Sequence, residues 1–153
     1  MRRSLLLLSM ALMSLAAMAG DFLLPLEGRQ QYAILISARG MEISGVCIIL
    51  SDNDGHKGTV VNEFGVHALD FTLSPDRKKL KLHNVVGPAN KWLVKRMLKR
   101  DLKVLLSAQN TGEYKGKRVV VMEDDGTLTL ENRKYQLKYS LKALNDDDHE
   151  TAQ

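Results

Sequence analysis

The stretch YQLKYSLK, residues 135–142, decides the fold, because every second side chain in it is apolar or aromatic. A strand points successive side chains to opposite faces, so this period of two predicts one dry face and one wet face. Residues 79–83 repeat the pattern, with Leu80 and Leu82 between two lysines and a histidine. Such alternation is typical of an antiparallel sheet with one solvated face.

Working outward from these two segments, the sequence predicts eight strands in a meander. Short separators at residues 52–55, 74–76 and 124–126 contain Asp, Asn, Gly and Pro, which favour tight turns. Because the separators are short, we expect consecutive strands to pair as hairpins. The strands are expected near residues 30–38, 41–51, 57–63, 66–74, 78–86, 117–123, 127–131 and 134–143.

One segment, residues 90–106, breaks the period of two. Its apolar residues recur every three or four positions, as on the buried side of an amphipathic helix. A basic row at spacing four lies on the same segment, with Arg96 and Arg100 beside it. The row is either the solvated side of a helix that covers the core, or a surface for anionic headgroups or an acidic partner. Its members are Lys91, Lys95, Lys99 and Lys103.

A single long helix cannot cover both faces of eight strands, so we expect the sheet to curl around its apolar face. The predicted class is α+β, a strongly curved antiparallel half-barrel covered by one main amphipathic helix. The apolar strand faces are mostly aliphatic, which suits an acyl chain and equally suits an ordinary packed core. The expected ligand-binding lining comprises Ile34, Ile36, Ile48, Leu50, Leu69, Phe71, Leu80, Leu82 and Leu98.

Residues 1–19 are expected to form a cleaved secretory signal. Two arginines precede an apolar stretch at residues 5–17, and Ala17 and Ala19 place small side chains where a signal peptidase cuts. The apolar stretch is shorter than the roughly 20 residues of a membrane span, and a retained anchor is the alternative. We therefore expect a periplasmic protein.

The rest of the chain is long enough for one domain with a core and too short for two. We place this domain at residues 20–144 and a disordered acidic tail at residues 145–153. The formal net charge of +4 includes the two arginines of the signal, so bulk charge identifies no partner. The lone Cys47 cannot form an internal disulfide, and its apolar neighbours predict a buried thiol.

No catalytic or metal-binding constellation is predicted. The four histidines lack the spacing of a metal site, and no serine lies in a nucleophile elbow. Glu63 and Asp70 flank a bend at residues 62–65, where Asn, Glu and Gly suit a hairpin, so a hydrolase is the weakest hypothesis. We expect a protein that is not an enzyme and that uses no cofactor, no metal and no nucleic acid.

Four segments follow one another in a suggestive order: EISGV at 42–46, VNEFGV at 61–66, LDF at 69–71 and MLKRDL at 97–102. In this order and local pattern, residues 30–106 resemble envelope proteins related to the outer-membrane lipoprotein carriers and receptors. The resemblance implies a curved antiparallel half-barrel with a helical lid around an apolar cavity. In that family the cavity accepts the acyl chains of lipoproteins.

Two functions of different classes follow from these observations. The first is a periplasmic binding protein that holds a lipid or a lipoprotein acyl chain, with a place in outer-membrane lipid or lipoprotein trafficking. The second is an envelope interaction module with a packed interior, which binds an envelope protein or an anionic membrane surface through the basic row or a sheet edge.

The signal segment makes a prediction about processing. Because signal peptidase cuts after a small-x-small sequence, the mature protein should begin at Gly20 and appear in the periplasmic fraction. Amino-terminal sequencing of the exported protein measures the cut. An intact Met1, with all the protein in the membrane pellet, would show that residues 5–17 are a retained anchor.

Overall fold

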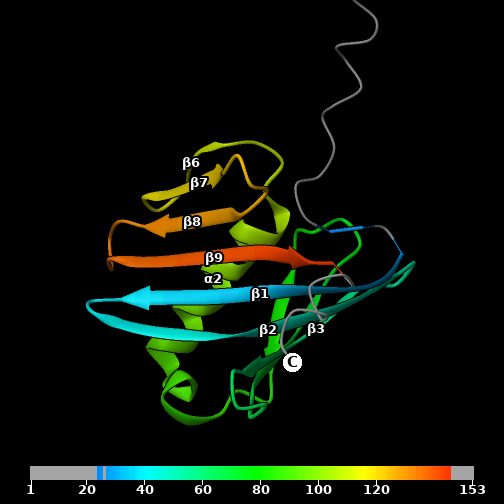
Figure 1. The fold of residues 1–153 in the computed structure, drawn as a ribbon, viewed down its shortest axis with the longest axis horizontal. Helices are drawn as coiled ribbons and strands as arrows, with labels where there is room; N and C mark the ends of the chain where they lie inside the picture. The colour runs from blue at the N-terminus through cyan, green and yellow to red at the C-terminus, as the bar shows by residue number, and fades with distance from the viewer. Residues whose placement is uncertain (1–23, 26, 146–153) are drawn as a thin grey trace, which may run out of the picture.

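The computed structural model describes residues 24–25 and 27–145, and these form a nine-stranded antiparallel sheet with one long helix (Figure 1). The predicted signal peptide and the predicted tail beyond Asn145 lie outside the described residues. The strands are β1 (Gly28–Ala38), β2 (Met41–Asp52), β3 (Gly55–Asn62), β4 (His67–Leu73), β5 (Leu80–His83), β6 (Gly112–Tyr114), β7 (Arg118–Met122), β8 (Leu128–Asn132) and β9 (Leu137–Leu144). A 3₁₀ turn, η1 (Gly87–Asn90), precedes the helix α2 (Trp92–Ser107).

The chain builds the sheet in two halves. Strands β1 to β5 run outward as hairpins to one edge, and α2 then carries the chain across one face of the sheet to the other edge (Figure 1). Strands β6 to β9 return as hairpins until β9 pairs with β1 at the centre. The predicted α+β class and hairpin meander are therefore confirmed, and the edge strands β5 and β6 stay unpaired with each other.

The predicted helix and all eight predicted strands are found, with shifted ends. The sequence pattern missed β6, because three residues are too few to show a period. It also began the last strand too early, since Tyr135 lies in the β8–β9 turn and Gln136 has a φ of 55°. That left-handed backbone ends the turn, and the alternation continues into β9 from Leu137.

The core lies between α2 and the sheet face that the helix covers. Directly paired residues on antiparallel strands share a face, so the register defines this inner face. From the helix, Leu98, Leu102, Leu105 and Leu106 are buried against it. The buried strand residues include Tyr32, Ile34, Cys47, Ile49, Val60, Leu69, Phe71, Leu73, Leu80, Val120, Leu128, Leu130, Leu137, Tyr139 and Leu141.

Two residues of the expected lining lie on the other face of the sheet. Tyr32 pairs with Cys47, so the odd-numbered positions of β2 face the helix, and Ile48 and Leu50 point away. Leu50 is 51% exposed. The prediction was wrong because residues 46–50 are all apolar. A strand without alternation does not reveal whether its odd-numbered or its even-numbered side chains face the core.

Cys47 is buried on the inner face, as predicted. Burial raises the pKa of its thiol to about 12, because the apolar surroundings disfavour the thiolate. The thiol therefore stays protonated at neutral pH and packs as a small apolar side chain.

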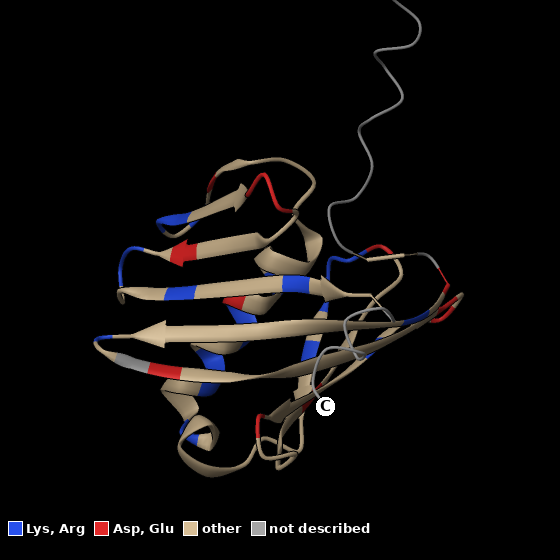
Figure 2. Ribbon diagram, in the orientation of Figure 1, with Lys and Arg blue, Asp and Glu red and all other residues tan. Residues whose placement is uncertain are grey.

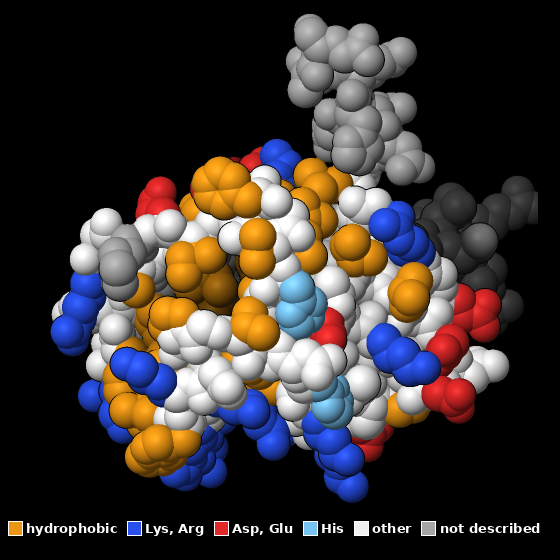
Figure 3. All heavy atoms as spheres, turned by 90° about the horizontal axis from the view of Figure 1, so that it is seen from below, with side chains coloured by type: hydrophobic (Ala, Val, Ile, Leu, Met, Phe, Trp, Pro, Cys, Tyr) orange, Lys and Arg blue, Asp and Glu red, His pale blue; other side chains and the backbone are white. Residues whose placement is uncertain are grey.

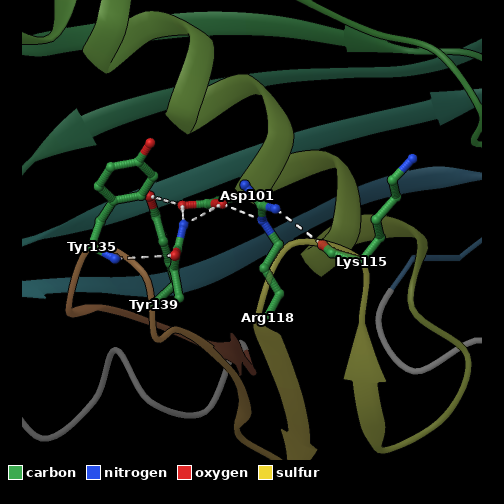
Figure 4. A network of polar contacts seen from close by, with 6 residues as sticks. Asp101, Lys115, Arg118, Tyr135 and Tyr139 are labelled. Atoms are coloured by element: carbon green, nitrogen blue, oxygen red, sulfur yellow. Dashed lines mark hydrogen bonds and ion pairs between the residues drawn. The ribbon is translucent and has the colours of Figure 1, made fainter.

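A buried polar network fastens α2 to the second half of the sheet (Figure 4). Its centre is Asp101 of the helix, which is 0% exposed. Arg118 Nε on β7 donates a hydrogen bond to Asp101 Oδ1 at 2.6 Å, and Tyr139 Oη on β9 donates one to Oδ2 at 2.8 Å. Asn132 Nδ2 on β8 donates to both carboxylate oxygens at 3.0 Å. One carboxylate thus joins the helix to three strands.

The same network extends to two turns. Arg118 Nη1 donates a hydrogen bond to the Lys115 carbonyl oxygen in the β6–β7 turn at 3.1 Å. Asn132 Oδ1 accepts one from the Tyr135 backbone N–H in the β8–β9 turn at 3.4 Å. Burial raises the pKa of Tyr139, and the negative charge of Asp101 raises it further, so its hydroxyl remains a donor at physiological pH.

Asp101→Ala should destabilise the protein by about 3–5 kcal/mol, because it leaves the guanidinium of Arg118 buried without its partner. Urea unfolding measures the loss as a lower midpoint. The matched double variant, Asp101→Ala with Arg118→Met, removes both charges and should recover part of the stability. A loss of less than about 1 kcal/mol in the single variant would mean that the network contributes little.

Candidate functional site

The meander brings alternate turns to the same end of the sheet. Since β1 and β2 are antiparallel, their turn lies at the end where β3 meets β4, where β6 meets β7 and where β8 meets β9. The chain also leaves β5 at this end and enters η1 and the start of α2. We refer to this part of the molecule as the hairpin end.

Exposed large hydrophobic side chains gather at the hairpin end. In the described part of the chain eight such side chains are exposed, and only Leu50 lies elsewhere, on the outer face of the sheet. Phe64 is 81% exposed and Trp92 is 72% exposed. Large apolar side chains that are left exposed in one part of a protein often mark a binding site. We call the remaining seven the apolar rim: Ile43, Phe64, Val66, Val86, Trp92, Leu93 and Tyr135.

A space-filling view from below shows a hollow surrounded by hydrophobic side chains, with basic side chains next to it (Figure 3). The apolar rim continues into the interior along β1 and β2, because Ile43 pairs with Ile36 on the inner face. Ile36 is only partly buried and packs against the core. A ligand at the rim would therefore reach the core first through Ile36.

Beside the rim is a second hollow of about 230 Å³, the cationic pocket. One face of α2 supplies four of its lining residues at the positions i, i+3, i+4 and i+7, which lie on one side of a helix. The β8–β9 turn and β7 close the other side. The lining residues are Leu93, Arg96, Met97, Arg100, Arg118, Lys134 and Tyr135.

The positive charge of this pocket is only partly neutralised. Arg118 forms its ion pair with Asp101, as described above. For Arg96, Arg100 and Lys134, we find no acidic partner within 4 Å in the described residues. Lys134 Nζ lies 5.2 Å from the centre of the Tyr135 ring, which is within the range of a cation–π contact.

The basic row of the helix lies outside the cationic pocket. Lys91 precedes α2, Lys95 is partly buried, and Lys99 and Lys103 are exposed on the helix surface. Figure 2 shows basic residues along α2. The role of the row as a headgroup or partner surface stays a prediction. Sequence reasoning missed Lys134 and Tyr135, which it assigned to a strand, because their meeting with α2 depends on the tertiary fold.

The other predicted lining residues lie on the helix side of the sheet. Ile34, Leu69, Phe71, Leu80 and Leu98 are buried in the core. Ile36 and Leu82 are partly buried against it. Within this set, Ile36 lies near the hairpin end, where it pairs with Ile43 of the apolar rim.

Ile48 and Leu50 line a different hollow, of about 380 Å³, on the outer face. Beside them, Asp70 accepts hydrogen bonds from Thr59 Oγ1 and from Asn84 Nδ2, the latter at 2.8 Å. His67 Nε2 lies 2.9 Å from Asp70 Oδ1. The hydrogen bond from Thr59, followed by those from Asn84 and His67, lowers the pKa of Asp70 to about 2. These contacts tie β3, β4 and the segment after β5 together.

Neighbouring polar groups at the β3–β4 turn also have structural partners. Ser44 Oγ donates a hydrogen bond to Glu63 Oε2 at 2.8 Å, and Asn62 Oδ1 accepts from the backbone N–H groups of Phe64 and Val66. In the described part of the chain, no group of three or more His, Cys, Asp or Glu side chains is arranged to hold a metal ion. Within the same residues, no helix is long and apolar enough to cross a membrane.

No protein-family model matches the sequence, and no curated protein matches it either.

Asp70 makes stability depend on pH in a defined direction. Its pKa of about 2 lies below the unfolded value of about 3.9, so its contribution is present above pH 4 and is lost as pH falls toward 2. In Asp70→Asn, the free energy of unfolding should therefore decrease less between pH 4 and pH 2 than in the unmodified protein. Denaturant titrations at each pH measure this.

The control is Asp54→Asn, which removes a carboxylate from the β2–β3 turn. This variant should keep most of the acid-dependent decrease. The pKa values of Asp76 and Asp125 are also lowered by local hydrogen bonds, so these two groups are expected to add to the acid-dependent decrease in both variants. Equal slopes in Asp70→Asn and the unmodified protein would contradict the assignment.

Proposed function

We propose that this protein is a non-enzymatic, periplasmic binding protein that holds a lipid or lipoprotein acyl chain at its hairpin end. The observation that carries the proposal is the apolar rim, in which seven large side chains remain exposed at one end of a single sheet. Each methylene buried from water contributes about 0.8 kcal/mol, so an acyl chain can bind such a surface without a specific polar partner.

In this proposal the sheet acts as a half-barrel and α2 acts as its lid. The acyl chain lies between the start of the helix and the β1–β2 and β3–β4 hairpins, and Ile36 and Ile43 lead it toward the interior. Ile36 and Ile43 are paired on the inner face, and Ile43 is 62% exposed. The resemblance to the lipoprotein carriers and receptors and the expected signal peptide favour a place in outer-membrane lipid or lipoprotein trafficking.

The alternative is an interaction module that uses the same rim to bind an envelope protein. The burial of Ile34, Leu69, Phe71 and Leu80 favours it, because these residues already pack against the core beneath the helix. An acyl chain would have to remain near the rim or displace α2. A partner protein would need only the exposed side chains.

Trp92 reports on the rim, because it is the only tryptophan in the chain and is 72% exposed. A neutral monoacylglycerol that covers the rim should shift its fluorescence emission to shorter wavelength. Leu93→Asn and, separately, Ile43→Asn should weaken the affinity about tenfold each, since each removes apolar contact worth about 1.4 kcal/mol or more.

The matched control is Leu50→Asn on the outer face, because Leu50 is 51% exposed and Leu93 is 52% exposed. This variant should bind the monoacylglycerol like the unmodified protein. Native mass spectrometry of protein purified from membranes provides a second readout. A clean apo mass, together with no shift of Trp92 emission, would reject the lipid carrier and leave the interaction module.

A further inference from the structure

We infer that the cationic pocket binds the phosphate group of an anionic lipid headgroup, an inference that rests on the proposed acyl-chain function of the apolar rim. The pocket and the rim share Leu93 and Tyr135. A molecule with its chain on the rim can therefore place its headgroup in the pocket without crossing a polar gap. This arrangement matches an amphiphile with one anionic group.

The chemistry of the pocket favours phosphate. Arg96 and Arg100 lie one helical turn apart on the same face of α2, and both line the pocket together with Lys134. Guanidinium groups match phosphate oxygens in pairs of parallel hydrogen bonds, and a phosphomonoester carries a charge of about −1.5 to −2. The charges of Arg96, Arg100 and Lys134 have no acidic partner within 4 Å in the described part of the chain.

The fold holds the two sides of the pocket in fixed positions. On the helix side, Arg100 directly precedes Asp101, whose carboxylate is held by β7, β8 and β9. On the turn side, Asn132 accepts the Tyr135 backbone N–H and donates to the same carboxylate. The helix segment that carries the two arginines and the turn that carries Lys134 are thus both anchored to the carboxylate of Asp101.

Arg118 adds a further donor at the base of the pocket. The hydrogen bonds that it forms use Nε and Nη1, and Nη2 has no partner among the described residues. Because Asp101 neutralises its charge, Arg118 contributes hydrogen bonding while Arg96, Arg100 and Lys134 supply the uncompensated charge. The lysines of the basic row are not among the residues that line the pocket.

The test compares two ligands that differ only in the phosphate, a lauroyl lysophosphatidic acid and the corresponding monolauroylglycerol. Trp92 fluorescence at low salt measures both affinities. We expect the phosphorylated ligand to bind at least about tenfold more tightly, and the ratio to shrink as salt screens the charges. Equal affinities would overturn the headgroup inference and leave the proposed function standing, whereas failure of both ligands to bind would overturn both.

Substitutions test whether the preference for the phosphorylated ligand comes from the cationic pocket. Arg96→Gln with Arg100→Gln should bind the two ligands with similar affinity, while Lys81→Gln with Lys138→Gln, which removes two charges from the outer face, should keep the preference. Unchanged thermal midpoints show that the variants are folded. A preference that survives the arginine variant, or that Lys99→Gln with Lys103→Gln abolishes equally, would overturn the inference.

Inorganic phosphate separates a headgroup site from a site for free phosphate. We expect it to compete with lysophosphatidic acid only at concentrations far above the affinity of the lipid, because it lacks the chain that contacts the rim. Binding of inorganic phosphate as tight as that of the lipid would show a free-phosphate site and would overturn the headgroup assignment.

Discussion

The carboxylate of Asp101 is the point on which the arrangement of this molecule depends. It lies wholly buried in α2 and receives hydrogen bonds from Arg118, Asn132 and Tyr139 on three consecutive strands. Apolar packing alone is tolerant of rotation, since leucine side chains can repack. A buried charge does not tolerate such a rotation of the helix, because a charge that is separated from its partners stays desolvated without compensating hydrogen bonds. The network therefore fixes which face of α2 meets the second half of the sheet.

That orientation decides what is left exposed. With Asp101 directed at the strands, the face of Leu93, Arg96, Met97 and Arg100 points to the β8–β9 turn and encloses the cationic pocket. The meander contributes the other half of the site, because antiparallel pairing sends alternate turns to one end of the sheet. Apolar and basic side chains from distant parts of the chain then form one amphipathic surface. The proposed ligand likewise has an apolar part, the acyl chain, and a charged part, the anionic headgroup.

The sequence predicted most of the fold because alternation is a local signal. β5 and β9 show it directly, and the change to a period of three and four marks α2. The prediction was wrong where the pattern was uninformative. Residues 46–50 are apolar at odd-numbered and even-numbered positions alike, so Ile48 and Leu50 were assigned to the wrong face of the sheet. β6 is only three residues long and showed no pattern at all. The curvature expected of a half-barrel stays a prediction.

The sequence by itself determined the α+β class, the order of the strands in hairpins and the amphipathic helix, because each depends on residues close together in the chain. Only the tertiary structure decided the pairing of β9 with β1, the burial of Asp101 and the meeting of Lys134 and Tyr135 with α2. These features join segments that lie far apart in the sequence, since Asp101 is 17 residues from Arg118 and 31 residues from Asn132. Local periodicity carries no information about such pairs, since it reports which face is apolar and not which segment will cover it.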